Sequence, residues 1–156
     1  MKGRHSCRLA PAAFLLDRAT KLLACRLLTP QTPTQAIAGA FRFTLVQNTG
    51  AAFSMLAGKQ TLLLVITGVA IAAMTAFQLL SADKETPLFR AAMWLLIGGA
   101  AGNFFDRIAY GAVIDFIEAT FISFPIFNVA DICITTAFGL IVLAMLLQEK
   151  ERKEHG

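Results

Sequence analysis

Two long runs without a charged side chain constrain this chain more than any other feature. Thr61 to Leu80 is a run of about twenty residues, and Ile132 to Gln148 is a second of about seventeen. An α-helix needs about twenty apolar residues to cross the ~30 Å hydrocarbon core of a bilayer. Hydrophobic residues make up 56% of the 156-residue sequence and charged residues only 15%, whereas soluble domains carry about 25% charge. We therefore predict a membrane protein.

The remaining apolar sequence predicts two further membrane helices. Four spans are expected at about residues 9–28, 61–80, 88–108 and 129–148, with outer loops at about 29–60 and 109–128. The third span contains Gly98, Gly99 and Gly102, and small residues allow close packing of membrane helices. We expect residues 1–156 to form one integral-membrane domain.

The first outer loop carries a strand signal. Phe41 to Leu45 alternates apolar and polar side chains, which is typical of a short strand. Asn48-Thr49-Gly50 then supplies a turn signal and is followed by Ala51 to Ser54. The second outer loop is predicted as a mixed loop that holds Asp115. The expected fold class is an all-α membrane protein, with four transmembrane helices and a small extracytoplasmic β platform.

The beginning of the chain resembles a secretory signal. A basic start precedes a short apolar run, and Leu22 to Cys25 is similar to the lipobox of bacterial lipoproteins. Asp17, Arg18 and Lys21 interrupt the apolar run, whereas a signal peptide needs an unbroken apolar core of about 7–15 residues. A first membrane helix is the better interpretation. Asp17 and Lys21 lie four residues apart and share a helix face, so each can partly neutralise the other; alternatively, the pair is only a tolerated feature of a polar helix.

Basic residues set the expected orientation. Four spans place both termini on one side of the membrane, and most basic residues fall on that side or at its edge: Lys2, Arg4, Arg8, Lys84, Arg90, Lys150, Arg152 and Lys153. The other side holds only Arg42, Lys59 and Arg107. By the positive-inside rule, the termini are predicted to face the cytoplasm. Because the basic residues flank apolar runs, we expect no nucleic-acid partner.

This topology gathers the unusual polar residues in one outer layer, with Asp17 somewhat deeper. Its members are Asp17, Lys21, Asn48, Gly50, Asn103, Asp106, Arg107, Asp115, Asn128 and Asp131. Polar residues tolerated at random would not converge in this way. We therefore predict a site at the outer membrane interface.

Several kinds of chemistry lack the residues they need. His5 and His155 lie in the tails, and Cys7, Cys25 and Cys133 show no CxxC spacing. A zinc site or a Cys/His nucleophile therefore has almost no candidate residues. The sequence has no P-loop, and its serines lack the base that a catalytic triad requires. We expect no metal and no cofactor.

Two carboxylates remain, Asp115 in an apolar loop and Asp131 at the start of the fourth span. Burial and mutual repulsion separate the pKa values of such a pair, so that the two groups can share one proton and activate water. An aspartic-protease arrangement is therefore predicted. The alternatives are a capping role for Asp115, a helix-dipole role for Asp131, a proton relay in a transporter, and a structural membrane partner without chemistry. A transporter would place its polar groups near the midplane, usually within repeated halves, and we find no repeat.

Four sequence blocks resemble a known family, the bacterial lipoprotein signal peptidases (signal peptidase II). Asp17-Arg18-Ala19-Thr20-Lys21 is similar to its D-x-x-[ST]-K block, and Asn48 to Ser54 to its N-x-G-A-A-F-S block. Gly102 to Phe116 resembles G-N-x-x-D-R-x-x-x-G-x-V-x-D-F, and Phe127 to Asp131 resembles F-N-x-A-D. The blocks follow the family's order. Arg18 and Arg26 make the first span more basic than the family pattern.

The resemblance implies an aspartic endopeptidase of the bacterial inner membrane and a target of the antibiotic globomycin. Its substrates would be lipid-modified prolipoproteins, cut before the diacylglyceryl-modified cysteine, and its other partners membrane lipids; we expect a monomer. Asp115 and Asp131 would be the catalytic pair. The residues expected to position the substrate or support the pair are Asn48, Gly50, Asn103, Asp106, Arg107, Asn128, Asp17 and Lys21.

Overall fold

The computed structural model describes residues 6–35, 37, 39–50, 59–81 and 85–154. Within these ranges the chain forms a 3-10 turn, four α-helices and a two-stranded antiparallel sheet. In chain order they are η1 (Ser6–Arg8), α1 (Leu9–Leu27), β1 (Phe41–Asn48), α2 (Gln60–Leu80), α3 (Pro87–Tyr110), β2 (Val113–Ala119) and α4 (Val129–Glu154). The predicted fold class, a helical membrane protein with a small β platform, is confirmed. The predicted motif residues 51–54 fall among residues 51–58, outside the described part.

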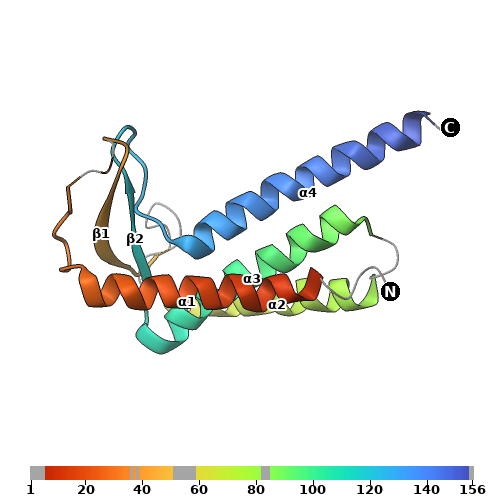
Figure 1. Cartoon of the computed structure of the whole chain (residues 1–156). Helices are drawn as coiled ribbons and strands as arrows, with labels where there is room; N and C mark the ends of the chain where they lie inside the picture. Colours follow the sequence, from red (N-terminus) through yellow and green to blue (C-terminus); the bar gives the residue numbers. More distant parts are fainter. Residues whose placement is uncertain (1–5, 36, 38, 51–58, 82–84, 155–156) are drawn as a thin grey trace.

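Helix α3 is the centre of the bundle. It packs against α1, α2 and α4, while the β ribbon stands at one end of the bundle (Figure 1). The start of α1 and the end of α4 both lie at the opposite end. Helix α3 begins at the N-cap Thr86, whose Oγ1 accepts a hydrogen bond from Phe89 N at 3.2 Å. It ends at Gly111, which adopts the left-handed φ of 68° that favours glycine.

Three helices in the described part, α2, α3 and α4, are long and apolar enough to cross a membrane. Helix α1 is less apolar because it carries Asp17, Arg18, Lys21 and Arg26. Asp17, Arg18 and Lys21 are buried against the bundle rather than directed outward. A helix can carry charges in a membrane protein when they face the interior and pair with one another.

Gly99 brings α3 close to α4. The sequence predicted close helix packing at the glycines of the third span but did not name the partner helix. A Cβ placed on Gly99 would lie 2.8 Å from the Ala130 carbonyl oxygen and about as near the Cys133 and Ile134 side chains, at 3.1 and 3.0 Å. Only a residue without a side chain fits such an approach. Because Ala130 lies one residue before Asp131, this contact fixes the start of α4 against α3.

The second strand was not predicted. Residues 113–119 were expected to belong to a mixed loop, but they pair with β1 over a register that joins Phe41 to Ala119 and Asn48 to Val113. The first strand also runs three residues past Leu45 and ends at Asn48. The predicted turn follows there, since Gly50 N donates to Asn48 Oδ1 at 2.9 Å. One face of the sheet covers α1 through a small core of Ala24, Leu45, Ile114 and Phe116. Asp115 and Asn48 occupy the other face.

Helix α4 is longer than its predicted span. The charged tail after Gln148 was expected to be a solvated end, and its residues up to Glu154 continue the helix. Glu149 there pairs with Arg152 and Lys153 at 3.0 and 3.3 Å. These exposed pairs at helical spacing favour the helix beyond the apolar segment.

Candidate active site

A cavity of about 270 Å³ lies where β1, β2, α3 and α4 meet. Five residues with charged or amide side chains line it: Asn48, Asn103, Arg107, Asp115 and Asp131. Its remaining walls are formed by Val113, Phe124, Pro125, Ile126, Phe127, Ile134 and Thr135. The two predicted catalytic aspartates therefore face one largely apolar cavity.

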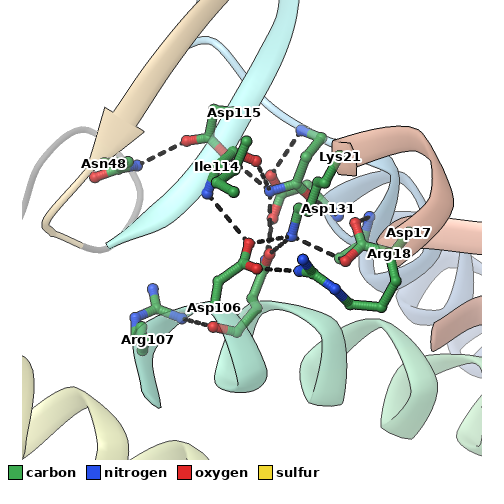
Figure 2. Close-up of polar contacts among 12 residues, drawn as sticks. Asp17, Arg18, Lys21, Asn48, Asp106, Arg107, Ile114, Asp115 and Asp131 are labelled. Carbon is green, nitrogen blue, oxygen red and sulfur yellow. Dashed lines mark hydrogen bonds and ion pairs between the residues drawn. The ribbon is translucent and has the colours of Figure 1, made fainter. Parts of the chain in front are cut away.

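Asp115 is held on both carboxylate oxygens. Asn128 Nδ2 donates to Asp115 Oδ1 at 2.7 Å, and Asn48 Nδ2 donates to Oδ2 at 3.1 Å (Figure 2). The residue is only 3% exposed. Burial, with the nearby charge of Asp131 adding to it, raises the pKa of Asp115 from 3.8 to about 7, although the two hydrogen bonds and Lys21 act in the opposite direction. Asp115 belongs to a strand, so the alternative role as a loop cap does not describe it.

Asp131 is held at the first turn of α4. Its Oδ2 accepts from the backbone N–H of Asn128 at 3.1 Å, and Asn128 Oδ1 accepts from the Asp131 N–H at 3.0 Å. This reciprocal pair is a capping box. Asp131 Oδ1 also accepts from Asn103 Nδ2 at 2.8 Å. Asp131 thus occupies the helix N-terminus, as the dipole interpretation required, and also opens into the cavity.

Asn128 connects the two carboxylates. Its side chain donates to Asp115, and its backbone N–H donates to Asp131. The residue is fully buried, and its Nδ2 also lies 3.0 Å from Asn103 Oδ1. Rotation of this amide would break its bonds to the Asp115 carboxylate and to the backbone N–H of Asp131.

A buried ionic cluster supports Asp115 and Asp131, called the dyad from here on, from the side of α1. Lys21 Nζ lies 2.9 Å from Asp17 Oδ2, 2.7 Å from Asp106 Oδ2 and 2.9 Å from Asn103 Oδ1. Lys21, Asp17 and Asp106 are all fully buried. The predicted pairing of Asp17 with Lys21 is confirmed, and Asp106 joins it from α3 (Figure 2).

The acidic members of this cluster also hold the backbone around the dyad. Asp17 Oδ1 accepts from Ala130 N at 3.0 Å, and Asp106 Oδ2 accepts from Ile114 N at 3.2 Å. Ala130 precedes Asp131, and Ile114 precedes Asp115. The cluster therefore fixes the residue next to each catalytic candidate.

Arg107 lines the cavity and holds Gly50, which follows β1. Arg107 donates from Nη2 to the Gly50 carbonyl and from Nη1 to the Asn103 carbonyl, both at 3.2 Å. Gly50 N in turn donates to Asn48 Oδ1 at 2.9 Å. These bonds orient the Asn48 amide so that its Nδ2 faces Asp115.

Sequence reasoning assigned no role to Arg18. The structure pairs Arg18 Nη1 with Asp106 Oδ1, and the guanidinium lies 4.7 Å from the centre of the Phe105 ring. Arg18 therefore adds a second cation to the cluster. The sequence signal was present, because Arg18 departs from the family pattern next to Asp17, but nothing in the sequence indicated its partner.

In the described part of the chain, three or more His, Cys, Asp or Glu side chains do not gather in a metal-binding arrangement.

Comparison with known proteins gives the same family. Residues 9–147 match the family model described as signal peptidase (SPase) II. The chain belongs to the signal peptidase II family. It is 38% identical to a lipoprotein signal peptidase of Symbiobacterium thermophilum, covering 92% of this chain and 95% of the relative. It is 35% identical to the Brevibacillus brevis protein of the same name, covering 93% and 97%.

Solved structures agree with the fold of this signal peptidase II member. A bacterial membrane enzyme determined by the in meso method superimposes with a TM-score of 0.86 at 32% identity, covering 96% of this chain and 92% of the other. A second such structure gives a TM-score of 0.82 at 33% identity, covering 91% and 92%. The chain is thus a multi-pass membrane protein of a bacterial protease family.

Proposed function

We propose that this protein is an aspartic endopeptidase that removes signal peptides from diacylglyceryl-modified prolipoproteins. It cuts before the lipid-modified cysteine, and Asp115 and Asp131 are the catalytic pair. The observation that carries the proposal is that both carboxylates line one cavity and are joined by a single residue, Asn128. Family membership supports the proposed reaction class, and this geometry supports the choice of residues.

The protonation state of Asp115 and Asp131 suits general acid–base catalysis with water as the nucleophile. Asp115 has a pKa of about 7 because it is buried near Asp131, so at neutral pH the pair can hold one proton between them. The ionised carboxylate accepts a proton from water as the water oxygen bonds to the scissile carbonyl carbon. The protonated carboxylate donates to the developing oxyanion or the leaving amine, and the carbon–nitrogen bond breaks. The pair then holds one proton again, because the water molecule has supplied the hydroxyl of the acyl product and the hydrogen gained by the amine.

The supporting residues divide into two groups by what they contact. Asn48, Asn103 and Asn128 donate hydrogen bonds to the dyad carboxylates. Asp17, Lys21, Asp106, Arg107 and Gly50 contact those amides or the neighbouring backbone. We assign the three asparagines to positioning the dyad. The other five residues position these asparagines or the backbone beside the dyad.

The membrane orientation follows from charge. With both termini in the cytoplasm, the β ribbon and the dyad cavity lie at the outer face of the bacterial inner membrane. The start of α1 and the end of α4 lie at the end of the bundle away from the ribbon (Figure 1), and Lys150, Arg152 and Lys153 lie on the continuation of α4 there. A lipid-anchored substrate in the outer leaflet would bring its scissile bond to this level, where water is available. We infer that the protein acts as a monomer.

The test is cleavage of a defined precursor by the purified protein. A prolipoprotein carrying a diacylglyceryl cysteine and the same precursor without lipid are each incubated with the enzyme in lipid vesicles. We expect release of the signal peptide from the lipidated precursor alone, with mass spectrometry placing the cut before the cysteine. Cleavage of neither precursor, together with proton flux across the vesicle membrane, would support the transporter alternative instead.

A further inference from the structure

Two further cavities continue from the dyad cavity around the end of β1. The first, of about 250 Å³, shares Asn48, Asp115, Pro125 and Ile126 with the dyad cavity. The second, of about 440 Å³, shares Val46, Gln47 and Thr49 with the first. Because neighbouring cavities share lining residues, the three lie side by side around the end of β1. We call the two added cavities the edge groove.

The deeper part of the edge groove lies between β1 and the end of α1. Its other lining residues are Cys25, Pro30, Gln31, Leu45 and Ile114. Side chains alternate across a strand, so Leu45 and Gln47 face away from the sheet face that carries Asn48. A chain that leaves the dyad therefore passes over the outer edge of β1 to reach this part.

The outer edge of β1 offers backbone groups to such a chain. Gln31 N donates to the Leu45 carbonyl at 3.0 Å, and Thr34 N donates to the Phe43 carbonyl at 2.9 Å. Backbone groups on one edge of a strand recur at every second residue, so the N–H and C=O of Gln47 face the same way. Within the described residues, the backbone bonds onto this edge stop at Leu45.

A bend at Gln31 limits how far the loop covers this edge. Gln31 has a φ of 58°, in the left-handed region that residues with a side chain rarely adopt. The bend coincides with the bond to Leu45 and leaves the next edge position, Gln47, facing the groove. A peptide at Gln47 would therefore occupy the sheet edge directly beyond the loop.

We propose that the edge groove binds the part of the substrate that follows the lipid-modified cysteine, as an extended peptide paired with β1 at Gln47. The inference rests on the proposed function, which puts the scissile bond at Asp115 and Asp131. The peptide runs from Asn48 toward Leu45 and is therefore antiparallel to β1. Pairing through the main chain provides affinity without requiring a particular sequence, which suits an enzyme whose substrates differ after the cysteine.

Cys25 provides a way to block the groove without changing the dyad. It lines the deeper cavity, and all three cysteines are thiols. A variant that keeps only Cys25 (Cys7→Ser, Cys133→Ala) is labelled with a bulky maleimide. The matched control keeps only Cys7, at the other end of α1, and carries the same label. Two lipidated precursors are compared, one ending one residue after the cysteine and one continuing into the mature sequence.

We expect the label on Cys25 to raise KM for the long precursor by roughly tenfold, the loss of one or two hydrogen bonds, with no change for the short one. The label on Cys7 should change neither value. An unchanged KM for the long precursor, or an equal rise for both precursors, would overturn the inference. If the unlabelled protein cleaves neither precursor, the proposed function fails, and the inference fails with it.

A second measurement tests the backbone pairing itself. Single N-methyl groups are placed on successive amides after the cysteine of the long precursor. Because an extended strand presents its amides to one neighbour at every second residue, one amide should be sensitive and the adjacent amides insensitive. If no position raises KM, the proposed pairing at Gln47 is wrong.

Discussion

Lys21 Nζ lies 2.9 Å from Asn103 Oδ1, and this contact turns the Asn103 amide so that Nδ2 points at Asp131. The same ammonium also pairs with two fully buried carboxylates, Asp17 and Asp106. The Lys21 side chain thus orients Asn103, which binds Asp131, and also neutralises the two buried carboxylates. We therefore expect stability and activity to be coupled at Lys21.

Replacement of Lys21 by methionine should damage both properties. The variant leaves Asp17 unpaired in the bundle interior, and breaking a buried ion pair costs about 3–5 kcal/mol. The Asn103 amide also loses its strongest donor. We expect a lower melting temperature in detergent and nearly complete loss of cleavage. A variant with wild-type stability and activity would show that the ionic cluster plays no part in the site.

Arg18→Gln should have a smaller effect. Asp106 loses one of its two cations but keeps Lys21, and a hydrogen bond to a charged group contributes about 1.5–3 kcal/mol. We expect a stability loss in that range with part of the activity retained. Arg26→Gln is the matched control, because Arg26 is exposed on the same helix and exposed substitutions usually change stability by less than about 0.5 kcal/mol. Equal melting temperatures for the two variants would contradict the role of Arg18.

The pKa of Asp115 predicts how stability and activity depend on pH. Folding raises this pKa from 3.8 to about 7, so the folded protein binds the proton more tightly than the unfolded chain. The favourable contribution is complete below pH about 4 and is lost as pH rises to about 7. Activity that needs one proton on the pair should also decline above pH about 7. A pH–rate profile that stays flat from pH 6 to about 9 would contradict the shared proton.

Asn48→Leu should change the pH above which activity declines. The hydrogen bond from Asn48 lowers the pKa of Asp115, so its removal raises this pKa further and shifts the decline in activity to higher pH. Thr44→Val is a control on the same strand, since Thr44 Oγ1 donates to Glu118, away from the dyad. The measurement is the pH dependence of kcat for both variants. A shift to lower pH in Asn48→Leu would reverse the predicted sign.

Gly99→Ala tests the contact between α3 and α4. The new methyl group would sit 2.8 Å from the Ala130 carbonyl oxygen, and overpacking of this kind costs about 1–3 kcal/mol. Because the displaced segment carries Asp131, activity should fall together with stability. Gly139→Ala is the matched control, since nothing lies within 4 Å of a Cβ at that position. It should be neutral or slightly stabilising, because alanine favours a helix over glycine by about 1 kcal/mol.

The sequence predicted the helices because long uncharged runs allow few other structures. It did not predict β2, and the reason is physical. Ile114 and Phe116 pack on the core beside α1, while Asp115 on the other face is also buried. A strand buried on both faces loses the alternation of polar and apolar residues that marks strands in a sequence.

The site was predicted as a layer of residues, and its contacts were not. Topology and motif blocks brought Asp115 and Asp131 to one level. The bond from Asn48 to Asp115 joins residues 67 positions apart, and it depends on the register between two strands, one of which was not predicted. The pairing of Lys21 with Asp106 likewise depends on the rotation of α1 against α3, which spacing along one helix does not determine.

The central claim is that Asp115 and Asp131 act together on one water molecule. The most direct test measures single-turnover cleavage of a lipidated prolipoprotein by Asp115→Asn and Asp131→Asn, with thermal unfolding as the check that each variant is folded. Each substitution removes one carboxylate from the pair, and we expect a loss of roughly 10²–10⁴-fold or more in both. A folded variant of either kind that cleaves at the wild-type rate would contradict the claim.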